Sequence, residues 1–258
     1  MRTLSSSCFA ALAFGYALAV EAFPLQPTYD FTFDGDGKTS TNSERTAEYK
    51  EGLVGRDNDF LDKSFIDSAL GKGFRLWAGS YGSGSEFRND PFTIAAYVKA
   101  PTEPKKVIWG AGHTKDNVAI FLATGETESE IQLCVYKKDA PGLVVLATAT
   151  VPDACLRPHL YTVIANKLNT ESFGFYVDGA KCETAAIHCE GFKLERNNLQ
   201  IGFVDGDYPP GYGRPSDDGS YMDELMIFDG TALNAALVSV LAEKFPHEVS
   251  RGLLILVR

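Results

Sequence analysis

The stretch Asp218-Gly-Ser-Tyr-Met-Asp-Glu-Leu-Met-Ile-Phe-Asp229 has the composition of the last long strand of an all-β sandwich. Its aromatic and aliphatic residues favour a strand, and the glycine and serine near its start favour a turn. An acidic pair, Asp223-Glu224, stands at its centre. Because successive residues of a regular strand point to opposite faces of a sheet, we expect these two carboxylates to face opposite sides.

Short apolar stretches separated by turn residues continue along the chain. One helix is predicted, with Asn234 as its N-cap and Pro246 after its end. Asp178-Gly179 is a strong hairpin signal, whereas residues 38–59 and 79–85 are expected to be loops. The pattern predicts an all-β sandwich or jelly roll with one short C-terminal helix. The expected strands are residues 29–33, 92–98, 107–110, 118–122, 131–136, 143–151, 161–165, 173–177 and 199–203, with a turn and a strand within 65–76.

The composition describes a globular, acidic chain. It has 258 residues, of which 45% are hydrophobic, and a formal net charge of -10. This provides enough apolar material for the core of one large sandwich. Because no cluster of Lys and Arg stands out, nucleic acids and anionic membranes are poor candidate partners. The acidic surface is compatible with cation binding, although solubility alone explains it.

The N-terminus has the features of a secretory signal peptide. Arg2 supplies a positive charge, residues 8–20 form an apolar run, and Val20-Glu21-Ala22 fits a cleavage site. We therefore expect residues 1–22 to be removed and residues 23–258 to form a single domain of a secreted, extracellular protein. The run is too short for a comfortable membrane span, so no transmembrane segment is expected in the mature chain; an uncleaved anchor is the alternative.

Four cysteines follow the signal peptide: Cys134, Cys155, Cys182 and Cys189. An even number in an oxidising compartment predicts two disulfides, and four cysteines allow three pairings. We favour Cys182–Cys189, which closes a short loop and leaves Cys134–Cys155 as the second pair. Cys134 lies inside a predicted strand whose hairpin partner would not be Cys155, so the other pairings stay open.

Four segments occur in an order and spacing that resemble a known family. Phe92-Thr-Ile-Ala-Ala-Tyr-Val-Lys99 is similar to an early strand Phe-Thr-Ile-x-x-Trp-Val, and Phe175-Tyr-Val-Asp-Gly179 to a hairpin Leu-Tyr-Val-Asp-Gly. Leu199-Gln-Ile-Gly202 is similar to a strand Leu-x-Ile-Gly, and residues 219–228 to a closing Gly-x-Ile-Asp-Glu-Val-x-Ile-Tyr segment followed by a helix. Together they resemble the laminin G-like domains of the concanavalin A-like lectin/glucanase superfamily over residues 29–245.

This resemblance implies a concanavalin A-like jelly roll of two antiparallel sheets. Domains of this family typically bind carbohydrates or proteins, and many hold one calcium ion. The resemblance therefore implies a glycan or an extracellular protein as the partner. The chain departs from the family pattern at Tyr97, at His159-Leu-Tyr161 and in the long insert of residues 205–218. These departures bear on the ligand rather than on the fold.

Three carboxylates are candidate calcium ligands. Asp34 and Asp36 lie in a Gly-rich turn, and Asp223 lies on the closing strand, which a jelly roll places near the first strand. Calcium takes about six to eight oxygen ligands from carboxylates and carbonyls. We expect one structural ion that joins both ends of the domain; an ordinary Asp-Gly turn is the alternative.

The sequence contains no recognisable catalytic arrangement. Glycosidases need two carboxyl groups facing one cleft, and glucanases of this superfamily alternate acids along one strand. The adjacent Asp223 and Glu224 lack that alternation. No nucleophile elbow, phosphate-binding loop or His-Glu-x-x-His helix is present. We therefore expect a binding module that is not an enzyme; the alternatives are a glycan-acting hydrolase on the same fold and a purely structural adhesion domain.

The insert of residues 205–218 is the candidate ligand-binding surface. Tyr208 and Tyr212 offer rings that could stack on a sugar or a side chain, and Arg214 and Asp217 offer polar contacts. Prolines stiffen the loop, which lowers the entropic cost of ordering it on binding. The alternative is a packed surface loop with incidental tyrosines.

Overall fold

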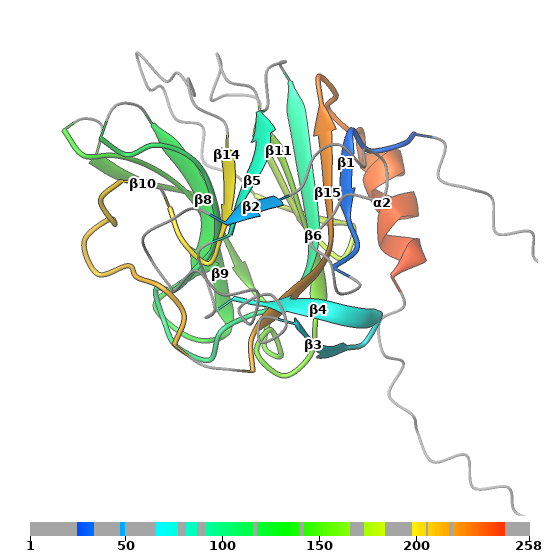
Figure 1. Cartoon of the computed structure of the whole chain (residues 1–258), viewed down its shortest axis with the longest axis horizontal. Coiled ribbons are helices and arrows are strands. Elements are labelled where there is room, and N and C mark those ends of the chain that lie inside the picture. Colours follow the sequence, from blue (N-terminus) through cyan, green and yellow to red (C-terminus); the bar gives the residue numbers. More distant parts are fainter. Residues whose placement is uncertain are drawn as a thin grey trace, which may run out of the picture.

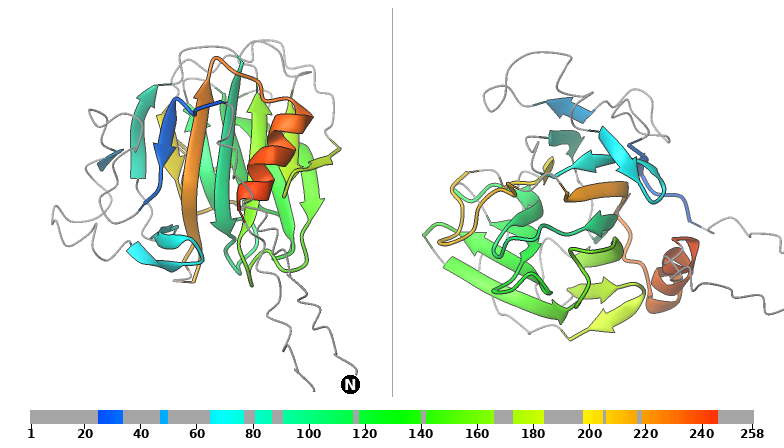
Figure 2. Two further views of the ribbon diagram at one scale, coloured as in Figure 1. Left: turned by 90° about the vertical axis from the view of Figure 1, so that its right-hand side faces the viewer. Right: turned by 90° about the horizontal axis from the view of Figure 1, so that it is seen from below.

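Two antiparallel β-sheets stack face to face, with one helix on the outside of one sheet (Figure 1, Figure 2). The predicted signal peptide and the candidate calcium ligands Asp34 and Asp36 lie outside the described part of the chain. The computed structural model describes residues 25–33, 47–49, 65–76, 81–86, 91–115, 118–139, 142–165, 173–183, 198–204, 206–216 and 219–245.

The first sheet contains eight strands within the described ranges, and every pairing between them is antiparallel. Their order is β13-β12-β11-β6-β15-β4-β3, and β1 also pairs with β15. The strands are β1 (Tyr29–Phe31), β3 (Phe65–Ser68), β4 (Gly71–Arg75), β6 (Phe92–Lys99), β11 (His159–Ala165), β12 (Gly174–Val177), β13 (Ala180–Cys182) and β15 (Tyr221–Asp229).

The second sheet contains seven described strands in the order β10-β9-β8-β7-β14-β5-β2, again antiparallel. Two of them, β2 and β5, lie in segments predicted as loops. The sequence of β5, Tyr-Gly-Ser-Gly-Ser-Glu, has little intrinsic preference for a strand, so its pairing with β14 and β2 determines its conformation. The strands are β2 (Ala47–Tyr49), β5 (Tyr81–Glu86), β7 (Val107–Gly112), β8 (Ala119–Thr124), β9 (Glu130–Lys137), β10 (Gly142–Thr150) and β14 (Asn198–Ile201).

Side chains from the inner faces of both sheets form the main core. Trp109 of β7 and Phe175 of β12 are at most 1% exposed, and the rings of Tyr161 and Phe175 stack at 6.5 Å. Each large apolar side chain that becomes fully buried contributes about 1.5–3 kcal/mol. This continuous core makes the two sheets one sandwich and confirms the predicted all-β fold.

Helix α2 (Ala235–Lys244) covers part of the outer face of the first sheet (Figure 2). Asn234 is its N-cap, as predicted, and its side-chain oxygen accepts a 2.9 Å hydrogen bond from the backbone N–H of Leu237. No helix in the described ranges has the length and apolar character that crossing a bilayer demands. The buried residues of the helix pack against the outer face of the sheet: Val238, Leu241 and Ala242 on the helix, and Tyr97, Met226 and Phe228 on the sheet.

The favoured cysteine pairing is not formed. No disulfide joins Cys134 to Cys155. The thiol of Cys134 lies on the outer face of the second sheet beside Phe121, whereas Cys155 lies in the loop between β10 and β11, near the inward-facing Tyr161. Burial raises the pKa of the Cys134 thiol to about 12. Cys182 also forms no disulfide, and its predicted partner Cys189 lies outside the described residues.

The insert after β14 folds back over the outer face of the second sheet. The backbone oxygen of Phe203 would lie 2.8 Å from a Cβ atom placed on Gly110, so this close crossing requires glycine in β7. Tyr212 is 9% exposed, and its ring packs edge-on against Phe121 at 5.5 Å. The hydroxyl of Tyr212 donates a 2.5 Å hydrogen bond to the side-chain oxygen of Gln132. The insert is therefore a packed part of the domain.

We predict that Tyr212→Phe lowers the free energy of unfolding by about 1–3 kcal/mol, because the buried oxygen of Gln132 loses its donor. Urea denaturation of both proteins measures this difference. Tyr208→Phe is the matched control, since the hydroxyl of Tyr208 instead accepts from Arg214 and its side chain is only partly buried. Equal stability of wild type and Tyr212→Phe would show that the insert is not anchored by this bond.

Candidate functional site

A β-bulge lies at the acidic pair of β15. Asp223 pairs with Tyr97 and Met226 pairs with Ala95, so β15 uses three steps where β6 uses two. The extra residue is Glu224, whose φ is 47°, in the left-handed region that non-glycine residues rarely adopt. The strand therefore does not alternate regularly here.

Because of this bulge, the two acidic side chains share one face of the sheet. Asp223 lies opposite Tyr97, whose ring packs under α2 on the outer face, and directly opposed residues share a face. Glu224 lines a pocket together with Met226 and Phe245, which belong to the same outer cluster. The expectation that the two carboxylates face opposite sides is wrong, since it assumed a regular strand.

Asp223 holds the bulge in place. Its side chain is 1% exposed and accepts a hydrogen bond from the hydroxyl of Ser68. Its other oxygen accepts from the backbone N–H of Glu224 at 2.9 Å. The carboxylate thus ties the β3–β4 hairpin to β15 and fixes the backbone that directs Glu224 outward.

The pocket beside Glu224 has a volume of about 490 Å³. It lies between the segment before β1, the β3–β4 turn, the bulge and the C-terminal end of α2. Asp30 pairs with Met226 across β1 and β15, so its carboxylate shares the outer face with Glu224. The polar lining is Gln26, Asp30, Glu224 and Lys244, and the apolar lining includes Leu70, Met226, Leu241 and Phe245.

This lining suits a polar ligand that has apolar faces. Carboxylates accept hydrogen bonds, an ammonium donates them, and an amide does both. Hydroxyl groups of a sugar can therefore form hydrogen bonds with Asp30, Glu224, Lys244 and Gln26, while its C–H groups contact the apolar side chains. The pocket draws its residues from four separate segments, which is why sequence reasoning did not find it. The sequence shows Glu224 only as one member of the acidic pair on the closing strand.

A second pocket, of about 290 Å³, lies on the other side of the β3–β4 turn. Its lining includes Lys99 at the end of β6, Arg157 in the β10–β11 loop and Tyr221 at the start of β15. Asp67 and Ser68 of the hairpin also face it. The two pockets therefore flank one hairpin.

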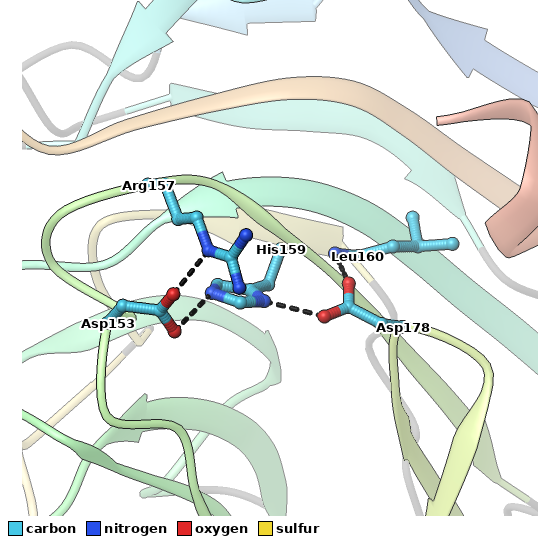
Figure 3. A network of polar contacts seen from close by, with 5 residues as sticks. All are labelled: Asp153, Arg157, His159, Leu160 and Asp178. Carbon is cyan, nitrogen blue, oxygen red and sulfur yellow. Dashed lines mark hydrogen bonds and ion pairs between the residues drawn. The ribbon is translucent and has the colours of Figure 1, made fainter. Parts of the chain in front are cut away.

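A partly buried polar network supports Arg157 (Figure 3). Arg157 forms an ion pair with Asp153, whose other oxygen lies 3.0 Å from Nε2 of His159. Nδ1 of His159 lies 2.6 Å from Asp178, which also accepts from the backbone N–H of Leu160. Each ring nitrogen of the 3% exposed His159 therefore lies within hydrogen-bonding distance of a carboxylate. The network ties the β10–β11 loop to the β12–β13 hairpin.

Two of the four predicted ligand residues, Tyr208 and Arg214, contact each other. The side chain of Arg214 donates from Nε to the hydroxyl of Tyr208 at 3.1 Å and lies 5.3 Å from the ring of Phe203. Tyr212 is buried against the sheet, so its ring does not form an exposed stacking surface. Ligand contacts by Tyr208 and Arg214 stay a prediction, and Asp217 lies outside the described residues.

The predicted calcium site is only partly visible. Both oxygens of Asp223 already accept hydrogen bonds, from Ser68 and from Glu224. In the part of the chain that the structure describes, no three side chains of His, Cys, Asp or Glu gather as metal ligands. These contacts favour a hydrogen-bonding role for Asp223, so a calcium site would depend on Asp34, Asp36 and their neighbours.

No protein-family model and no curated protein matches the sequence. Solved structures do match in fold. Domain 4 of AbnA, a GH43 extracellular arabinanase from Geobacillus stearothermophilus, solved with arabinotriose, has a TM-score of 0.56 at 18% identity over 84% of this chain and 98% of that domain. The botulinum neurotoxin serotype G binding domain has a TM-score of 0.58 at 14% identity over 85% of this chain and 51% of its own.

A further match is the botulinum neurotoxin serotype D ligand binding domain, solved in complex with N-acetylneuraminic acid. Its TM-score is 0.50 at 9% identity, over 85% of this chain and 51% of its own. This chain therefore spans about half the length of each toxin domain. The chain has a jelly-roll sandwich fold. That fold is of the concanavalin A-like type, and the matches do not single out laminin G-like domains.

We predict that Asp153→Asn destabilises the domain at neutral pH and that the difference from wild type disappears in acid. Burial raises the pKa of Asp153, but the combined lowering by His159 and Arg157 is larger. The pKa of Asp153 therefore lies below the ordinary 3.8. A depressed folded-state pKa stabilises the fold above pH 3.8, and this stabilisation is lost as the pH falls through the folded-state value. Denaturation at several pH values measures it.

The exposed Asp139→Asn is the matched control for this prediction, and we expect it to have no such pH dependence. A difference between wild type and Asp153→Asn that stays constant from pH 7 to pH 2 would contradict the assigned network.

Proposed function

We propose that the protein is a secreted binding module without enzyme activity and that it recognises a glycan in the pocket beside Glu224. The observation that carries this proposal is the bulge at Glu224. A non-glycine residue in the left-handed region costs about 1–2 kcal/mol, and such strain concentrates at functional sites. Here it directs a carboxylate into a pocket with an apolar lining and three further polar side chains.

The similar structures support a glycan as the ligand class. The AbnA domain, which this chain matches over 98% of that domain's length, was solved with arabinotriose. The fold thus serves carbohydrate binding in at least one protein of comparable size. An extracellular protein partner is the alternative, and a structural adhesion domain is a second. A glycan array separates glycan binding from both.

The Glu224 variants test the proposed site. We predict that Glu224→Gln weakens glycan binding by about tenfold, since a charge-assisted hydrogen bond to a sugar hydroxyl becomes a neutral one. Glu243→Gln on the exposed face of α2 is the matched control and should bind as wild type does. Titration calorimetry with the best glycan of the array provides the measurement, and unchanged affinity in Glu224→Gln would exclude this pocket.

Glu224→Gly separates a functional role from a structural one. Glycine removes the backbone strain at φ 47°, which stabilises the folded state. Glycine also gives the unfolded chain more conformational entropy, which offsets up to about 1 kcal/mol of that stabilisation. We therefore expect the free energy of unfolding to stay unchanged or to rise by up to about 1 kcal/mol, while glycan binding is lost. Thermal denaturation and calorimetry of the same sample measure both. A clear loss of stability would show that Glu224 mainly supports the fold.

One observation favours a glycan-acting hydrolase as the second candidate. Asp30 and Glu224 are two carboxylates that line one pocket on one face of the sheet, as glycosidase chemistry requires. If the domain is a hydrolase, glycans that bind should be shortened on incubation, and both Asp30→Asn and Glu224→Gln should abolish the products. Binding without any product at high protein concentration would count against this candidate.

Secretion, a laminin G-like family and calcium are parts of the same proposal. The apolar run before residue 22 and the four family-like segments support the first two. Calcium rests on Asp34 and Asp36 in the Gly-rich sequence Asp34-Gly-Asp-Gly37. A ligand that binds only the folded state raises the melting temperature, so EDTA should lower it if calcium is bound. A melting temperature that EDTA leaves unchanged would remove calcium from the proposal.

A further inference from the structure

The second pocket presents two cations from separate segments of the chain. Lys99 comes from the end of β6 and Arg157 from the β10–β11 loop. One carboxylate, that of Asp67, also lines the pocket, but it forms an ion pair with Lys72 at 2.8 Å. The pocket therefore has an excess of positive charge within a chain of net charge -10.

Lys99 is the less constrained of the two cations. It forms no ion pair with any residue that the structure describes, and it is partly exposed at the pocket. Unpaired lysines at an open surface are ordinary, but this one faces a second cation across a concave site. An anion between them would satisfy both groups.

Arg157 is held in position from behind. Asp153 contacts its guanidinium through Nε, and Asp153 is itself fixed by the buried His159 (Figure 3). A guanidinium has five N–H donors, so donors at the two terminal nitrogens remain for a ligand. This support lowers the entropic cost of ordering a long side chain on binding.

The two pockets lie close enough to serve one ligand. Both open on the outer face of the first sheet on either side of the β3–β4 turn, with Leu70 in the Glu224 pocket and Asp67 in the cationic one. Along β15, Tyr221 lines the cationic pocket and Glu224 lines the other, a separation of roughly 10 Å for three strand residues. A short oligosaccharide can span this distance.

The two pockets carry opposite charges, and this determines which part of a ligand each pocket can bind. Asp30 and Glu224 would repel an anionic group, whereas hydroxyl groups can donate to them. We propose that the ligand is an oligosaccharide with a carboxylate or sulfate group, which binds between Lys99 and Arg157 while a neutral sugar ring occupies the Glu224 pocket. This inference rests on the proposed glycan-binding function.

The experiment uses the full chain and a printed array of matched oligosaccharides in neutral, carboxylated and sulfated forms. Wild type should bind at least one acidic form about tenfold more tightly than its neutral counterpart, and 0.5 M NaCl should reduce this preference. Lys99→Gln should remove most of the preference and leave neutral binding unchanged. Lys99→Glu should make the acidic form the weaker ligand.

Two further variants complete the test. Arg157→Gln should act like Lys99→Gln, with its melting temperature recorded because Arg157 also contacts Asp153. Lys181→Gln on the exposed strand β13 changes the net charge equally at a distant site and should keep the preference. An equal loss in Lys181→Gln would assign the preference to overall charge and overturn the inference.

The outcomes also separate this inference from the proposed function. Equal binding of neutral and acidic forms by wild type would overturn the anionic subsite and leave glycan binding intact. Absence of binding to every oligosaccharide would overturn both. The arm that binds best, carboxylated or sulfated, identifies the anionic group.

Discussion

The hydrogen bonds that Asp223 accepts from Ser68 and from its own neighbour determine how the outer face of the first sheet is built. They stabilise a bulge in a strand that pairs with β6 on one side and with β1 and β4 on the other. Without the bulge, every residue of β15 after Glu224 would change face. The apolar side chains of β15 that pack against α2 would then point into the core between the sheets. The site and the packing of the helix therefore depend on one buried carboxylate.

Local signals in the sequence were sufficient for most of the architecture. Alternation, the Asp178-Gly179 turn and the Asn234 cap act between near neighbours, and the strands and helix they predict are present. The strands β2 and β5 were missed because pairing with other strands, rather than their own composition, stabilises them. The bulge was missed for a similar reason. The bulge is defined by the pairing of β15 with β6, which the sequence of β15 alone does not show. A regular strand therefore predicted opposite faces for Asp223 and Glu224.

The candidate site was largely hidden from sequence reasoning. Asp30, Glu224 and Lys244 are far apart in the chain, and nothing in a single sequence indicates that they line one pocket. The insert attracted attention through its tyrosines, but composition does not distinguish a stacking ring from a buried one. Contact with Phe121 and Gln132 makes Tyr212 part of the interior. Gly110 is the residue in the sequence that this packing requires, because the chain at Phe203, just before the insert, crosses β7 too closely for a side chain there.

The thiol of Cys134 lies beneath this insert, and burial suppresses its ionisation. Only the thiolate reacts readily with disulfides and alkylating reagents, so in the closed domain this cysteine is chemically silent. It becomes reactive when Tyr212 and the chain around it lift from the sheet. The rate at which a thiol reagent labels Cys134 therefore measures how often the insert detaches locally from the outer face of the second sheet.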